Sequence, residues 1–191
     1  DAPELVHWHG LDVGAVPDGA TEEGSSIIQP GGTLDYRFVP PRSGTRWYHT
    51  HTMAMMDFSR ALYSGQFGFL IVEPRRDPRR YDREVLLAAH HWDADLPDMP
   101  RSPEECATPR YRYATFNGRL MQAAEPIRVR QGERVLFRFL NASATETVSL
   151  ALPGHAFTVV ALDGNPVANP APVSVITLGV AERVDAIVHM N

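Results

Sequence analysis

The sequence of 191 residues has a formal net charge of -5, with 43% hydrophobic and 21% charged residues, which suits one full globular domain or two small ones. No run of like charges stands out, which argues against a nucleic acid or an anionic membrane as partner. A single cysteine excludes an internal disulfide framework, and no apolar stretch approaches the roughly 20 residues that a membrane-spanning helix needs.

The predicted elements are almost all β-strands. Apolar residues recur at every second position or in short runs, and glycine or proline interrupts them at short intervals. The sequence therefore predicts an all-β sandwich architecture, with one helical candidate at residues 53–62. In chain order, the predicted strands are residues 34–39, 67–72, 85–89, 127–130, 135–140, 148–152, 158–162 and 184–189.

The composition changes between about residue 74 and residue 116, where proline, arginine and acidic residues dominate. We place a domain boundary near residue 76, which predicts one domain in residues 1–76 and a second in residues 77–191. A weak internal repeat relates residues 29–38 to residues 179–188, each a turn followed by an alternating strand. In the second half, this unit follows a predicted hairpin over residues 127–140 and the strand 148–152. No counterpart precedes it in the first half, so we expect that the first domain is truncated at its N-terminus.

Two His-x-His pairs are the chemically informative feature: His7 with His9, and His49 with His51. Side chains two residues apart on a strand point to the same face, so each pair presents two imidazoles to one side. If the two strands are neighbours, cross-strand Cβ separations of about 5 Å bring all four imidazoles within reach of shared metal ions. Imidazole suits copper, zinc, iron and nickel, so the ligand type alone does not choose the metal.

The two pairs belong to a longer pattern: His-Trp-His-Gly at 7–10, Pro-Asp-Gly at 17–19, Ile-x-Pro-Gly at 28–31, Gly-Thr-x-Trp-Tyr-His-x-His at 44–51 and Gly-x-Phe-Gly-x-Leu-Ile-Val at 65–72. The order and spacing of these motifs resemble the first domain of multicopper oxidases of the laccase group. Residues 117–191 are similar to the second, copper-free cupredoxin domain of the three-domain members. The resemblance implies two cupredoxin-like Greek-key β-sandwich domains, the first of them incomplete.

The resemblance also assigns roles to single residues. It implies that His7 binds a type 2 copper and that His9, His49 and His51 bind the type 3 pair. It further implies that Asp18 lies behind these ligands and helps to deliver protons. The alternative for Asp18 is a turn residue, because Pro-Asp-Gly favours a turn without any other function.

The activity that the resemblance implies is an oxidase reaction, in which one-electron oxidation of a substrate is coupled to four-electron reduction of dioxygen to water. The reducing substrate of such enzymes is commonly a phenol, an aromatic amine or a metal ion, and their location is periplasmic or secreted. This chain would supply half of the histidines of the trinuclear copper cluster. A third cupredoxin domain, expected to be missing here, brings the other half.

The type 1 copper site of the family has no counterpart in this sequence. Its His-Cys-His segment does not occur, and Thr50 stands between the histidines of the second pair. Cys106 lies in a proline-rich stretch without a neighbouring histidine, which favours a loop or core thiol. We therefore expect that these residues alone do not oxidise a substrate, since electrons have no type 1 entry point.

Two other interpretations stay open from the sequence. One is a mononuclear metalloenzyme of the cupin or carbonic anhydrase kind, which also uses His-x-His on a strand. The other is a copper-free scaffold with the cupredoxin fold. The remaining histidines favour structural roles, and methionines in a short apolar segment favour packing over Cu(I) binding. These residues are His90, His91, His155, His189, Met53, Met55 and Met56.

Overall fold

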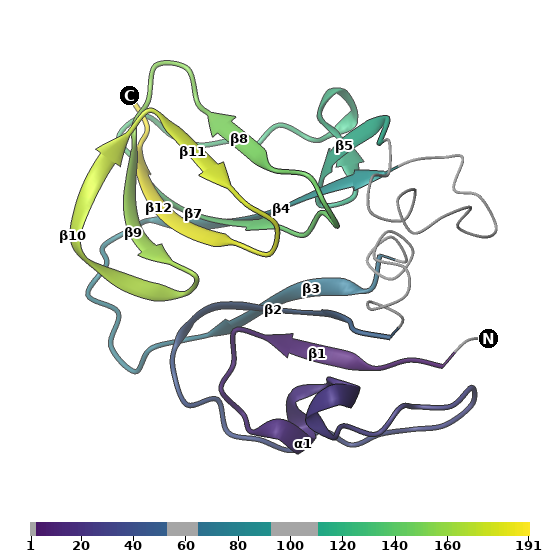
Figure 1. Cartoon of the computed structure of the whole chain (residues 1–191). Coiled ribbons are helices and arrows are strands. Elements are labelled where there is room, and N and C mark those ends of the chain that lie inside the picture. The colour runs from purple at the N-terminus through teal and green to yellow at the C-terminus, as the bar shows by residue number, and fades with distance from the viewer. Residues whose placement is uncertain (1–2, 53–64, 93–110) are drawn as a thin grey trace.

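The structure, a computed structural model, describes residues 3–52, 65–92 and 111–191. The described residues fold almost wholly into β-strands joined by loops and single-turn helices, which confirms the predicted fold class. Figure 1 shows the arrangement in layers: a sheet of β1, β2 and β3 faces one side of a larger sheet, and β8 and β11 lie over its other side. None of the helices among these residues is long and apolar enough to cross a membrane.

The two His-x-His pairs lie in or directly beside a three-stranded antiparallel sheet in the order β1-β2-β3. Its strands are β1 Val6–His9, β2 Gly44–Thr50 and β3 Phe67–Val72. The connection from β1 to β2 contains the helix α1 Ala15–Asp18 and the 3-10 helix η1 Thr21–Glu23, which lie beside β1 in Figure 1. This connection therefore passes close to the residues that flank the first histidine pair.

The large sheet has seven strands in the order β10-β9-β12-β7-β4-β5-β6. Only β4 and β7 run parallel, and every other described pair is antiparallel. The two-stranded layer pairs β8 with β11, and the 3-10 helix η2 follows β6. The bounds are β4 Arg83–Trp92, β5 Tyr113–Phe116, β6 Arg119–Leu120, η2 Met121–Ala123, β7 Arg134–Asn141, β8 Val148–Ala151, β9 Phe157–Leu162, β10 Asn165–Val173, β11 Val175–Leu178 and β12 Arg183–His189.

Two apolar cores hold the layers together, and both follow from strand alternation. Alternate residues of β7, such as Val135 and Phe137, pack towards β8 and β11 in the first core. Leu140 points to the opposite face of β7 and packs with Trp47 of β2 in the second core. Burial removes apolar surface from water, which stabilises the fold by about 25 cal/mol per Å².

Most predicted strands are confirmed, but two predictions are wrong. Residues 34–39 are not part of a strand, although Tyr36 and Phe38 bury their rings against Trp8. An alternating pattern indicates that one face of a segment is covered. Here the segment packs its alternate side chains against Trp8 without pairing its backbone with a strand. Residues 127–130 are likewise outside any strand, with Ile127 45% exposed, so the expected hairpin over residues 127–140 does not form. The helical candidate 53–62, its three methionines and Cys106 lie outside the described residues.

Candidate metal centre

The pairing of β1 with β2 brings the two histidine pairs to one face of the sheet. His7 lies directly across from His49, and His9 lies across from Trp47. His51 continues the row, since its backbone N–H donates to the carbonyl of Leu5. The ring centroid of His7 is 5.4 Å from that of His9, 5.2 Å from that of His49 and 5.2 Å from that of His51. The structure thus places the four predicted imidazoles together.

The ring nitrogens approach one another closely at the centre of this group. One nitrogen each of His7, His9 and His49 lies within 4.8 Å of the other two. The closest approach is 3.2 Å, between Nδ1 of His9 and Nε2 of His49. Two nitrogens bound to one ion at about 2.0 Å in tetrahedral geometry are roughly 3.3 Å apart. The spacing therefore fits two ligands of a single metal ion.

Two of the four rings form a hydrogen bond to a protein group at their other nitrogen, and a third ring lies near a carboxylate. Nδ1 of His7 lies 2.9 Å from the carbonyl oxygen of Asp18 and 3.1 Å from its carboxylate. Nδ1 of His49 lies 2.8 Å from the carbonyl oxygen of Thr50, and Nδ1 of His51 lies 3.8 Å from a carboxylate oxygen of Glu22. Such contacts fix the orientation of a ligand histidine and leave its Nε2 for the metal. His9 differs, because its Nδ1 is the atom that faces the group.

Asp18 reaches His7 through a tight local geometry. It is the last residue of α1, and Gly19 ends the helix in the left-handed conformation with φ 87°. A Cβ at Gly19 would overlap the carbonyl oxygen of Val6, so the two segments can approach this closely only with glycine at this position. The Pro-Asp-Gly sequence therefore forms a turn and also sets the Asp18 carboxylate beside the first histidine.

Burial keeps the central imidazoles neutral. Loss of solvent lowers the pKa of His9 to about 3, with a further contribution from the nearby positive charge of Arg183. Burial also lowers the pKa of His49 to about 4, although its contact with the Thr50 carbonyl acts in the opposite direction. Neutral imidazole is the form that binds metal. The donor set, its spacing and its charge state together fit copper, one of the metals that imidazole suits.

Comparison with known proteins decides the family. Two family profiles, both described as multicopper oxidase, match residues 1–77 and residues 82–191. The chain belongs to the multicopper oxidase family. Its described sheets are those of multicopper oxidase cupredoxin domains. The division at residue 76 stays a prediction.

Individual multicopper oxidases resemble the chain over nearly its whole length. It is 30% identical to the multicopper oxidase MmcO of Mycobacterium tuberculosis, covering 97% of this chain and 41% of that protein. It is 27% identical to copper resistance protein A of Pseudomonas syringae pv. tomato, covering 99% of this chain and 38% of that protein. The chain thus spans about two fifths of these curated relatives.

Solved structures give the same result for the fold. The blue copper oxidase of Nitrosomonas europaea superposes with a TM-score of 0.88 at 26% identity, covering 99% of this chain and 59% of that one. A multicopper oxidase from Pseudomonas thermotolerans has a TM-score of 0.86 at 32% identity, covering 100% of this chain and 46% of that one. The arrangement of sheets around the histidines is therefore that of the family.

Three histidines for which the sequence favoured structural roles, His90, His91 and His155, contact ordinary protein groups. His90 and His91 point to opposite faces of β4, as expected, with Nδ1 of His90 2.7 Å from the carbonyl oxygen of Ala142. His91 contacts the hydroxyl of Ser143, and His155 contacts the carbonyl of Pro153.

The sequence analysis missed Glu22, whose carboxylate approaches His51. The sequence offered one signal for it, since Glu22 follows Asp18 by four residues in the same connection between the two histidine pairs. The loop geometry that folds this turn over the cluster could not be derived from the sequence.

Proposed function

We propose that His7, His9, His49 and His51 supply half of the ligands of a trinuclear copper cluster in an oxidase. In this assignment His7 serves the type 2 copper, and the other three serve the type 3 pair. The observation that supports it most directly is the convergence of ring nitrogens from His7, His9 and His49 within 4.8 Å. Family membership supports copper as the metal.

The residues of this chain contribute placement and proton handling. Backbone pairing of β1 with β2 sets the positions of the rings, and the hydrogen bonds at Nδ1 determine which nitrogen of His7 and His49 is offered. Copper held there would supply the single-electron steps that reduce dioxygen to water. The Asp18 carboxylate, 3.1 Å from Nδ1 of His7, is placed to hold a proton beside the reaction centre.

The remaining ligands of the cluster must come from outside residues 1–191. We propose that a further cupredoxin domain supplies four histidines and the type 1 copper, together with the site for a phenol, an aromatic amine or a metal ion as reducing substrate. The family, which includes copper resistance proteins among the relatives, supports an extracytoplasmic location. Residues 1–191 by themselves should not oxidise such substrates.

Copper titration of the purified chain tests the ligand assignment. We expect the chain to bind copper and the variant His49→Ala to lose affinity by more than the roughly 10- to 100-fold typical of a lost outer partner. His155→Ala is the matched control, because this half-buried histidine follows a turn of the other sheet system and contacts the carbonyl of Pro153, outside the group of four. Unchanged affinity in His49→Ala would refute the proposal.

Metal competition separates the alternatives. Tight binding of a single zinc or iron ion in preference to copper would favour the mononuclear metalloenzyme. Absence of binding by any of these metals, in a chain shown to be folded by circular dichroism, would favour the copper-free scaffold. Electron spin resonance of the copper-loaded chain gives a second readout, since altered hyperfine splitting in His7→Ala would identify the type 2 ligand.

A further inference from the structure

The face of the large sheet that packs against β1–β3 continues beyond that contact. On β7, Leu140 lies under Trp47, whereas Arg134, on the same face near the start of the strand, lines a cavity. On β12, Ile187 and His189 point to the same side and line the same cavity. The sheet face therefore has two ends, one covered by the histidine-bearing sheet and one open to a ligand.

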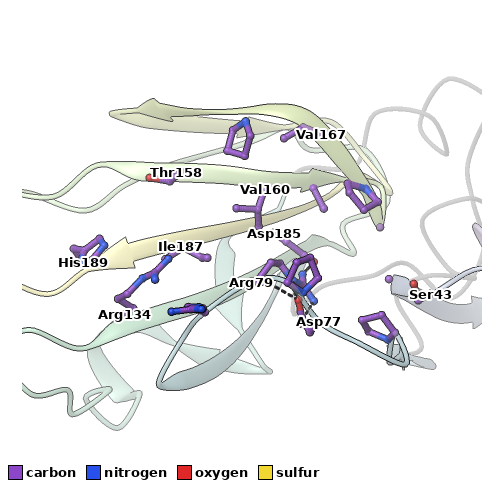
Figure 2. Close-up of a pocket in the computed structure, with 18 residues that line it drawn as sticks. Ser43, Asp77, Arg79, Arg134, Thr158, Val160, Val167, Asp185, Ile187 and His189 are labelled. Atoms are coloured by element: carbon purple, nitrogen blue, oxygen red, sulfur yellow. Dashed lines mark hydrogen bonds and ion pairs between the residues drawn. The ribbon is translucent and has the colours of Figure 1, made fainter.

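The open end forms a cavity of about 640 Å³. The sheet provides one wall, with Val160 and Ile187, and the connection from β3 to β4 provides the opposite wall through Pro74 and Pro78. Figure 2 shows Arg134 and His189 towards one end of this cavity, and Asp77, Arg79 and Asp185 towards the other. Its volume lies within the roughly 300–1,000 Å³ of small-molecule sites, which are mostly apolar with a few polar groups.

The carboxylates of the cavity are already neutralised. Asp77 is paired with Arg79 at 2.7 Å, and Asp185 is paired with Arg79 at 3.0 Å and with Arg138 at 2.8 Å. A cationic ligand at Asp185 would have to displace its buried ion pairs, which costs more than it gains, and at Asp77 it would compete with the bidentate contact from Arg79. The acidic end of the cavity is therefore not a cation site.

The other two arginines that line the cavity have no such partner among the described residues. Arg134 and Arg80 line the cavity, and in the described part of the chain neither guanidinium has a carboxylate within ion-pair distance. Nε of Arg134 is buried and has no hydrogen-bond partner there, and Asp82 accepts only the backbone N–H of Arg134. His189 lies directly across from Arg134 in the β7–β12 register. The uncompensated charge of the cavity is positive.

We propose that this cavity binds a small organic carboxylate with an aromatic or branched aliphatic body. The carboxylate would bind the guanidinium of Arg134, which offers two parallel donors to such a group. The body would lie against Val160 and Ile187 and the proline wall, which excludes water from the ion pair. The site is separate from His7, His9, His49 and His51 and does not require copper.

Calorimetric titration of the full chain with 2-naphthoate tests this proposal. We expect 2-naphthoate to bind at least about tenfold more tightly than the neutral 2-naphthalenemethanol, because a hydrogen bond to a charged partner contributes that much. Arg134→Met, which keeps an apolar stem but removes the charge, should weaken 2-naphthoate binding by about tenfold or more. It should leave the binding of the alcohol unchanged.

Two further variants make the test decisive. Arg119→Met removes an exposed arginine of β6 that does not line the cavity, and it should bind 2-naphthoate as the unaltered chain does. Val160→Trp fills the cavity and should weaken the acid and the alcohol alike. Equal affinities for acid and alcohol, or unchanged binding in Arg134→Met, would overturn the proposal. If Arg134→Met does not fold, Arg134→Gln, which keeps a polar side chain but removes the charge, provides the same comparison.

Discussion

Strand β2 contributes to two polar clusters on one face, and the clusters differ in whether their polar atoms find partners within the chain. Thr45 enters a buried ion network, Trp47 fills the apolar core beside it, and His49 enters the histidine group. The Thr45 hydroxyl donates to Asp185 at 2.6 Å, and Arg138 donates to both Thr45 and Asp185. Each charge of that network has a partner within the chain.

The histidine group is different, because its members offer nitrogens to one another with only one close contact, at 3.2 Å. Imidazole nitrogens gathered without a complementary protein group are incomplete until something else binds them. A polar cluster whose members are all paired with one another is structural, whereas ring nitrogens that converge on one point can accept a metal ion. The difference between these two ends of β2 can be tested by breaking each in turn.

The largest effect is expected from breaking the ion network. Asp185→Ala leaves Arg138 and Arg79 without their shared carboxylate, and loss of one partner of a buried pair costs about 3–5 kcal/mol. Urea unfolding should report this loss, while copper affinity of the folded fraction should stay unchanged. The double variant Asp185→Leu with Arg138→Met should recover most of the stability, because apolar replacement removes the stranded charge as well. A fall in copper affinity at unchanged stability would contradict the division of roles.

The sequence predicts much of the histidine end and almost nothing of the network. Period-two alternation and the His-x-His spacing suffice for β1 and β2, since neighbouring strands must aim such pairs to one side. The pairing of Thr45 with Asp185 joins residues 140 positions apart, and no local pattern records it. The wrong strand at residues 34–39 has the same origin, because alternation shows a buried face without showing which backbone, if any, pairs with it.

The pH dependence of stability should distinguish the buried histidines from the ion network. Burial lowers the pKa of His9 to about 3, and that of His49 and His90 to about 4, against 6.5 for each when the chain is unfolded. The unfolded chain therefore binds more protons below pH 6.5, so stability is full above that pH and falls as the pH drops towards 4. For His90, which is 1% exposed, the loss is on the order of 3 kcal/mol between pH 7 and pH 4.

The ion network should respond only at lower pH. The hydrogen bond from Arg79 holds the pKa of Asp77 below its usual value, so the stability from this group is present above about pH 4 and is lost as the pH falls further. Urea unfolding of the metal-free chain across pH 3–7 checks both statements. His90→Phe, which keeps a ring against Phe67, should flatten the curve between pH 6.5 and 4. An unchanged slope in that variant would show that His90 does not titrate as described.

A smaller effect is expected from the turn that carries Asp18. Gly19→Ala adds a Cβ that overlaps the Val6 carbonyl, at a backbone φ of 87° that favours glycine, and should cost about 1–3 kcal/mol. Because relief of the overlap moves Asp18 away from His7, copper affinity should fall about tenfold. Gly24→Ala is the matched control: its φ is 100°, and its added Cβ meets nothing within 4 Å. It should lose stability through backbone strain but keep its copper affinity.

The smallest effect is expected at Glu22. It tests whether the Glu22 carboxylate orients the His51 ring for metal binding. The carboxylate lies 3.8 Å from Nδ1 of His51 and is half exposed, so water competes for this contact and the loss of copper affinity in Glu22→Ala should be about tenfold at most. Glu23→Ala removes the same charge from the same 3-10 helix and should change nothing. Glu22→Gln keeps an oxygen acceptor for Nδ1 and should retain most of the affinity. Equal losses in Glu22→Ala and Glu23→Ala would instead mean that η1 acts through its overall negative charge. A contact that orients His51 would make only the Glu22 variant lose affinity.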